Sequence, residues 1–163
     1  MQDVNLVVLF HSRGEWIERL ALAAAVGAVQ GRANIRLRCL AGNAGEAAAD
    51  TKVDTEYVVP RDSDVEWADA IMAGTLPGAD RSADGLERYF DSLCASHGRG
   101  KLAGKIGALF TEGSGAASLQ SAMQRAGLTI VGMISEPDQL TASWLQGRRV
   151  AEAARSLRNR RKA

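Results

Sequence analysis

Three apolar runs of strand length each end in a short polar loop, and a helix-like segment follows each loop. The runs and their loops are residues 5–10 with 11–16, 70–74 with 75–79, and 106–110 with 111–115. Apolar runs without polar alternation are typical of strands covered on both faces, as in parallel sheets. In an open parallel sheet, loops at the carboxyl ends of neighbouring strands converge on one crevice, where ligands bind. The pattern of strands and loops therefore predicts where a ligand binds, and it does not identify the reaction.

The rest of the chain also alternates helix and strand. Helices are predicted at residues 16–29, 83–97, 115–126 and 141–161, and further strands at residues 35–40 and 128–133. In the first of these strands apolar residues alternate with Arg36 and Arg38, which is typical of a strand with one face in water, at or near a sheet edge. Residues 57–59 are either a short strand or an extended connection.

Five strands joined by helices imply a parallel sheet, because right-handed crossovers place helices on both faces. We therefore predict an α/β fold: a flavodoxin-like three-layer sandwich with a five-stranded parallel sheet of order 2-1-3-4-5. In this order the three loops follow strands one, three and four, which are neighbours at the point where the strand order reverses. We expect one flavodoxin-like domain over residues 1–163, with a basic C-terminal end at residues 155–163 that frays.

The charge balance argues against nucleic acid as the main partner, because the net charge is only +1. The charge is uneven, however, since residues 148–162 contain seven Arg or Lys and a single acid, Glu152. Basic side chains at a helix C-terminus oppose the negative end of the helix dipole, so a solvated helix end is the simplest interpretation. The alternative is a nucleic-acid contact through residues 155–162.

The two cysteines indicate neither a metal site nor a disulfide. Cys39 and Cys94 form no Cys-x-x-Cys pair and the chain has two histidines, so we expect no metal site. Both thiols are predicted to be buried as small hydrophobes. No apolar run is long enough to span a bilayer, and the first one lacks a basic leader. A reducing cytoplasm is the compartment that we expect.

Segments around the loops carry a family pattern. Residues 67–75 read Trp-Ala-Asp-Ala-Ile-Met-Ala-Gly-Thr, residues 102–105 read Leu-Ala-Gly-Lys, and residues 144–151 read Trp-Leu-Gln-Gly-Arg-Arg-Val-Ala. Together with Ser12 and the helix start at Ile17, they resemble the motifs D-A-I-I-F-G-T, L-x-G-K and Y-x-G-x-x-V-A of the WrbA-type, flavodoxin-like NAD(P)H:quinone oxidoreductases. The resemblance covers most of the chain.

The resemblance implies an FMN-binding oxidoreductase that transfers electrons from NAD(P)H to a quinone or a similar acceptor, assembled as a homodimer or homotetramer. It implies that the FMN phosphate lies on the first loop and the flavin ring against the other two. The implied FMN-binding residues are Ser12, Arg13, Gly14, Glu15, Trp16, Thr75, Leu76, Pro77, Gly78, Ala79, Thr111, Glu112, Gly113, Ser114 and Gly115. No catalytic side chain is expected, because the cofactor carries the chemistry.

Several residues depart from the family's FMN loops. Glu15 lies where a phosphate dianion would bind, with Arg13 near enough to offset it, and Glu112 stands in a loop that the family fills with Ser, Thr and Gly. The second loop lacks the family's aromatic residue, and residues 134–140 replace a long glycine-rich insertion. The alternative hypothesis is therefore a flavin-free, flavodoxin-like binding or scaffold protein that has lost FMN affinity.

Two residues next to the first loop allow more than one interpretation. Trp16 either stacks on a flavin or quinone ring or packs as a staple at the helix start. His11 ends the first strand beside Ser12, but adjacent strand residues point to opposite faces of a sheet, so the two make a poor base and nucleophile pair.

Overall fold

The computed structural model describes residues 3–11, 15–40, 57–74, 80–97, 100–111, 115–134 and 136–163. The elements are β1 (Val4–His11), α1 (Glu15–Gln30), β2 (Ala33–Leu40), α3 (Asp62–Trp67), β3 (Ala70–Gly74), α4 (Asp80–His97), β4 (Ile106–Leu109), α5 (Ala116–Arg125), β5 (Thr129–Val131) and α6 (Gln139–Lys162). The strands pair in parallel in the order β2-β1-β3-β4-β5. The predicted fold class and strand order are confirmed.

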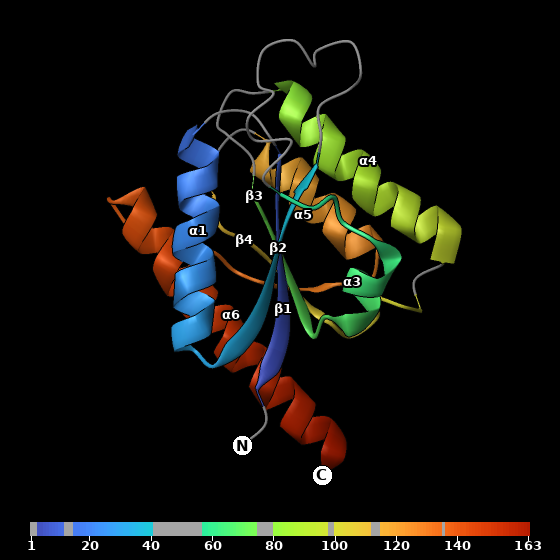
Figure 1. The fold of residues 1–163 in the computed structure, drawn as a ribbon. Coiled ribbons are helices and arrows are strands. Elements are labelled where there is room, and N and C mark those ends of the chain that lie inside the picture. Colours follow the sequence, from blue (N-terminus) through green and yellow to red (C-terminus); the bar gives the residue numbers. More distant parts are fainter. Residues whose placement is uncertain are drawn as a thin grey trace.

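Helices cover both faces of the sheet (Figure 1). Helices α1 and α6 pack on one face and helices α3, α4 and α5 on the other. The central strand β1 serves both cores, because Leu6, Val8 and Phe10 face α1 while Val7 and Leu9 face the opposite layer. This explains why β1 is apolar without alternation.

Helices α1 and α6 touch backbone to backbone at two glycines. A β-carbon built on Gly147 would lie 1.9 Å from the carbonyl oxygen of Ala24, and one built on Gly27 would lie 1.9 Å from the carbonyl oxygen of Trp144. No side chain fits at either position. The two glycines therefore set how closely α6 lies along α1, and so where the first turn of α6 reaches the carboxyl edge of the sheet.

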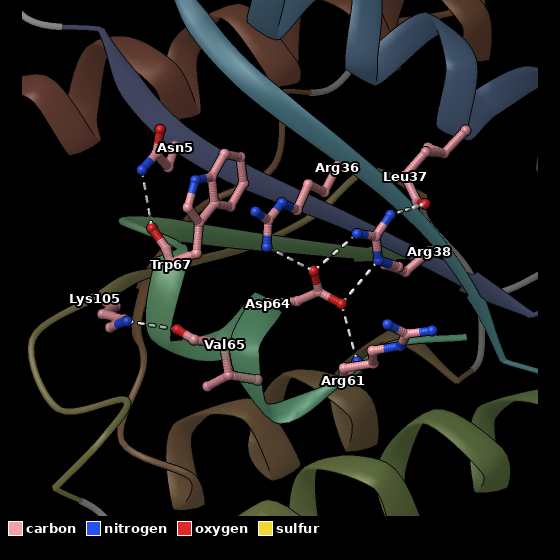
Figure 2. Close-up of polar contacts among 9 residues, drawn as sticks. All are labelled: Asn5, Arg36, Leu37, Arg38, Arg61, Asp64, Val65, Trp67 and Lys105. Carbon is pink, nitrogen blue, oxygen red and sulfur yellow. Dashed lines mark hydrogen bonds and ion pairs between the residues drawn. The ribbon is translucent and has the colours of Figure 1, made fainter. Parts of the chain in front are cut away.

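Strand β2 lies at the sheet edge, as predicted, but its basic face is only partly exposed to water. The side chains of Arg36 and Arg38 are 34% and 17% exposed, and both donate to the carboxylate of Asp64, which is 2% exposed. Figure 2 shows this carboxylate between the two guanidinium groups. The expectation of a wet face is wrong because α3 covers the arginines and supplies their counter-charge.

The element boundaries differ from the prediction in a few places. Residues 57–59 form an extended connection and not a strand, with the Val58 carbonyl accepting from the Cys39 amide at 3.2 Å. Strand β5 is shorter than the predicted range of residues 128–133. Cys39 is buried, but the prediction for Cys94 is wrong, because its thiol lies in a partly exposed position. Within the described ranges, no helix is long and apolar enough to cross a membrane.

Candidate functional site

The carboxyl ends of β1, β3 and β4 lie side by side. Phe10 pairs with Gly74, and Ala73 pairs with Leu109, so the three strands finish at nearly the same level. Helix α1 starts at Glu15, directly beyond the end of β1. Figure 1 shows these strand ends at one end of the sheet, with the start of α1 at the same level. We predicted that the three loops start close together. The structure confirms this for the strand ends from which the loops start.

Four of the predicted FMN-binding residues lie within the described ranges. Glu15 is exposed in the first turn of α1, Trp16 is 37% exposed, Thr111 is 5% exposed and Gly115 is the N-cap of α5. The remaining predicted residues lie outside the described residues: Ser12, Arg13, Gly14, Thr75, Leu76, Pro77, Gly78, Ala79, Glu112, Gly113 and Ser114. The structure thus places both ends of each loop, and the assignment of the loop residues stays a prediction.

The start of α1 decides whether an FMN phosphate fits this edge. A helix N-terminus presents unpaired amides and the positive end of the helix dipole, which suit a phosphate. Two carboxylates lie in the first turn, but that of Glu18 accepts from the Tyr57 hydroxyl at 2.5 Å and is held there. The tyrosine hydroxyl is neutral, so both carboxylates of this turn repel an anion, and water screens the exposed one of Glu15. The residues present therefore fit a phosphate group, with a penalty from both carboxylates.

Trp16 ties the start of α1 to the start of α6. Its indole Nε1 donates to Gln139 Oε1 at 3.0 Å, and the guanidinium of Arg19 lies 5.1 Å from the ring centroid. This contact fixes the indole at the rim of the carboxyl edge. It also gives a structural role to Gln139, which the sequence did not identify as a residue of the site.

Two buried polar side chains of α6 hold the ends of the strands. Ser143 Oγ donates to the Phe110 carbonyl at 2.8 Å. Gln146 donates to the Gly132 carbonyl and accepts from the Ile134 amide, both at 3.2 Å. Neither Ser143 nor Gln146 is exposed to solvent. Sequence reasoning missed both, although polar residues three apart on the packed face of a helix are a usable signal.

Aromatic packing closes the space below the strand ends. A β-carbon on Gly74 would lie 2.3 Å from Phe110 Cε2, so the ring occupies the place where a side chain of residue 74 would be. On the opposite face of the sheet the His11 imidazole lies against Gly85 of α4 and is 6% exposed. A small apolar cavity between α1 and α6 includes Leu20, Phe110 and Thr111 in its walls. The floor of the candidate site is thus formed by closely packed, buried side chains.

Comparisons with known proteins identify relatives for the chain. No protein-family model matches it. It is 30% identical over 139 residues to an NAD(P)H dehydrogenase (quinone) of Brucella suis (strain ATCC 23445 / NCTC 10510), an alignment that covers 78% of this chain and 70% of the relative. The corresponding protein of Brucella abortus (strain S19) is 29% identical over the same coverage.

Solved structures share the fold at low sequence identity. A flavodoxin, WrbA-like protein from Agrobacterium tumefaciens superposes with a TM-score of 0.57 and 22% identity, over 94% of this chain and 98% of that one. The flavoenzyme NAD(P)H:(acceptor) oxidoreductase FerB from Paracoccus denitrificans superposes with a TM-score of 0.60 and 16% identity, over 96% and 98% of the two chains. Because the identity to the Brucella suis protein extends over most of both sequences, this chain belongs to the NAD(P)H dehydrogenase (quinone) family.

Proposed function

We propose that this protein is an FMN-dependent oxidoreductase that transfers electrons from NAD(P)H to a quinone or a similar acceptor. The observation that carries the proposal is that β1, β3 and β4 end side by side next to the start of α1. The chain that has this arrangement belongs to the quinone dehydrogenase family. In parallel α/β sheets this edge is where nucleotides bind.

The roles that we propose for the chain's own residues rest on the family resemblance and on where the described strands end. We assign the phosphate to the first loop and the amides of α1, from Ser12 to Trp16, and the flavin ring to residues 75–79 and 111–115. FMN supplies the hydride acceptance and the electron transfer to the acceptor when it is bound. The buried Phe110 and Thr111 keep water from the floor of the site, and Ser143 holds the Phe110 carbonyl in place. No side chain of the described residues is assigned a proton transfer.

The first prediction is that the purified chain binds FMN. Titration of FMN with the full-length protein should quench flavin fluorescence, with a dissociation constant in the micromolar range. Riboflavin should bind more weakly, because it lacks the phosphate that the α1 amides recognise. The loaded protein should oxidise NADH or NADPH when benzoquinone is present. No quenching at high micromolar FMN would contradict the proposal.

The second prediction concerns the competing carboxylate at the helix start. Glu15→Gln should tighten FMN binding by about threefold to fivefold, because an exposed charge near a helix terminus contributes less than about 1 kcal/mol. Riboflavin affinity should not change, and added salt should shrink the difference. Glu152→Gln on α6 is the control, since it removes the same charge from an exposed position. Equal effects of Glu15→Gln on both flavins would show that charge repulsion is not the cause.

A flavin-free binding or scaffold protein is the second candidate, and the exposed Glu15 in the phosphate position favours it. The two candidate functions differ in whether the wild-type chain binds FMN. If the wild-type chain fails to bind FMN and the double variant Glu15→Ser with Glu112→Ser gains affinity, the flavin-free assignment holds. If the freshly purified chain is yellow with a flavin absorption spectrum, the assignment is wrong.

We also propose that residues 1–163 form one domain and that the protein acts as a homodimer or homotetramer. Leu22, Val26 and Val29 support association, because they lie along α1 and are 42%, 51% and 51% exposed. We propose the cytoplasm as its compartment, which is supported by Cys39 and Cys94 being thiols that are not joined in a disulfide.

A further inference from the structure

A cavity of about 240 Å³ opens at the amino edge of the sheet, at the opposite end of the strands from the proposed flavin site. Its walls come from three parts of the chain: residues 66–69, which are the end of α3 and the two residues after it, residues 104–105 before β4, and the last turns of α6. In Figure 1 this edge is the end of the sheet where β1 begins near the last turns of α6. Nothing in the proposed electron transfer uses it.

Three cationic side chains line the cavity, and backbone carbonyls hold each of them in place. Lys105 Nζ donates to the carbonyls of Val65 at 2.6 Å and Glu66 at 3.2 Å, as Figure 2 shows for the first. Arg161 donates to the Gly104 carbonyl at 2.6 Å, and Arg158 to the Asp3 carbonyl at 3.0 Å. Carbonyl oxygens orient these groups but do not neutralise their charge.

The acidic residues of the cavity walls leave an excess of positive charge. Asp69 accepts from Arg158 at 3.2 Å and from the Asn5 amide at 2.9 Å, so the charges of Asp69 and Arg158 offset each other and the excess comes from Lys105 and Arg161. Glu66 forms an ion pair with Lys101 at 2.7 Å. These are the two acids among the residues that line the cavity, against Lys105, Arg158 and Arg161. An anion is the ligand that would complete this charge distribution.

The backbone at Gly104 makes room for one of the cations. Gly104 has a φ of +75°, and a β-carbon there would lie 2.0 Å from Arg161 Nη2. The guanidinium therefore rests against the glycine and remains at the cavity wall. Burial lowers the pKa of Lys105 below its ordinary 10.5 and Arg161 adds to the shift, whereas Asp69 and Glu66 oppose it. Lys105 thus lies where a bound anion would stabilise its charged form.

We propose that this cavity binds a small dianionic oxyanion, with phosphate monoesters of small metabolites as the ligand class. Guanidinium and ammonium groups arranged around a concavity match phosphate oxygens, because charge-assisted hydrogen bonds are among the strongest that proteins form. The volume suits a single phosphorylated small molecule and is below that of typical drug-sized pockets. The site is independent of FMN, since it lies at the other end of the strands.

The test is a titration of the flavin-free, full-length protein, followed by backbone amide NMR shifts. The probes are inorganic phosphate, glycerol 3-phosphate and sodium chloride at matched ionic strength. Both phosphates should shift the amides of residues 66–69 and 104–105 with saturation, and chloride should not. Shifts confined to residues 15–18 would place the anion at the helix start of the proposed flavin site and overturn the proposal. So would equal effects of chloride and phosphate.

Matched variants on α6 locate the site. Arg161→Gln should weaken phosphate binding about tenfold, which is the loss expected for charge-assisted hydrogen bonds. Arg149→Gln removes the same charge from an exposed position on the same helix outside the cavity, and should leave binding unchanged. Arg161→Lys should recover part of the affinity, because the charge remains. Thermal melts verify that each variant is folded, and equal weakening by Arg149→Gln would overturn the proposal.

Discussion

Gly147→Ala is expected to lower the free energy of unfolding by about 2–3 kcal/mol. The added methyl would start 1.9 Å from the Ala24 carbonyl oxygen, and neither partner is a flexible side chain that can turn away. The two helices must separate or tilt, and because the clash is with backbone atoms the cost is about 3–4 kcal/mol, at or just above the upper end of the usual range for overpacking. The higher helix propensity of alanine returns about 1 kcal/mol of this at most. The melting temperature should therefore fall by roughly 4–12 °C.

Two other glycines test this explanation. Gly27→Ala should destabilise the protein to a similar extent, because its methyl would meet the Trp144 carbonyl across the same contact. Gly132→Ala is the control, since no atom lies within 4 Å of its added β-carbon. Urea unfolding followed by far-UV circular dichroism gives the three free energies. Equal stability of the Gly147→Ala and Gly132→Ala variants would contradict the close helix contact.

The Gly147 substitution should also reach the candidate site. Gln139, Ser143 and Gln146 lie on the same helix and hold Trp16, the Phe110 carbonyl and the residues after β5. A shift of α6 away from α1 would move all three contacts together. We therefore expect FMN affinity to fall in the Gly147→Ala variant even at temperatures where it remains folded, whereas Gly132→Ala should retain the wild-type affinity.

The sheet could be predicted from the sequence because its signals are local. Apolar runs such as residues 5–10 and 106–110 need only their own composition to indicate buried strands, and the strand order follows from the crossover rule. The convergence at the carboxyl edge follows from the order alone. Resemblance to a family added the cofactor, because composition does not identify a flavin.

The contacts that set the site's shape could not be predicted, because they join residues far apart in the chain. Ser143 reaches Phe110 across 33 residues, and Trp16 reaches Gln139 across 123. The basic face of β2 was wrongly expected to be wet for the same reason. Its counter-charge, Asp64, lies 26 residues beyond Arg38, after a stretch with little secondary-structure signal.

Asp64→Asn is expected to destabilise the protein by about 3 kcal/mol at neutral pH, because removing one partner of a buried ion pair leaves the other charges uncompensated. The carboxylate accepts from Arg36 at 3.0 Å, from two nitrogens of Arg38 at 2.8 Å each, and from the Arg61 amide at 2.9 Å. These bonds join edge strand β2 to α3. Arg36 also lies 4.1 Å from the centroid of the Trp67 ring, so its displacement would loosen that packing too.

The effect of Asp64→Asn should depend on pH in a defined direction. Burial raises the pKa of Asp64, but the bonds from Arg38, the Arg61 amide and Arg36 outweigh it and hold the pKa below its ordinary 3.8. A depressed pKa in the folded state contributes stability that is complete above the unfolded-state pKa and is lost as the pH falls through the folded-state value. The difference between wild type and variant should thus be constant above about pH 5 and shrink below about pH 4.

Asp62→Asn provides the matched control for this pH dependence. Asp62 lies in the same short helix but is exposed, so its loss should cost less than about 1 kcal/mol. Urea unfolding of the wild type and both variants between pH 3 and pH 8 measures the three curves. If the Asp64→Asn difference stays flat down to pH 3, or matches that of Asp62→Asn at pH 7, the buried carboxylate does not hold β2 to α3 through its charge. A larger loss for Asp64→Asn that fades with acid is the outcome expected for a carboxylate enclosed by two guanidinium groups and an amide.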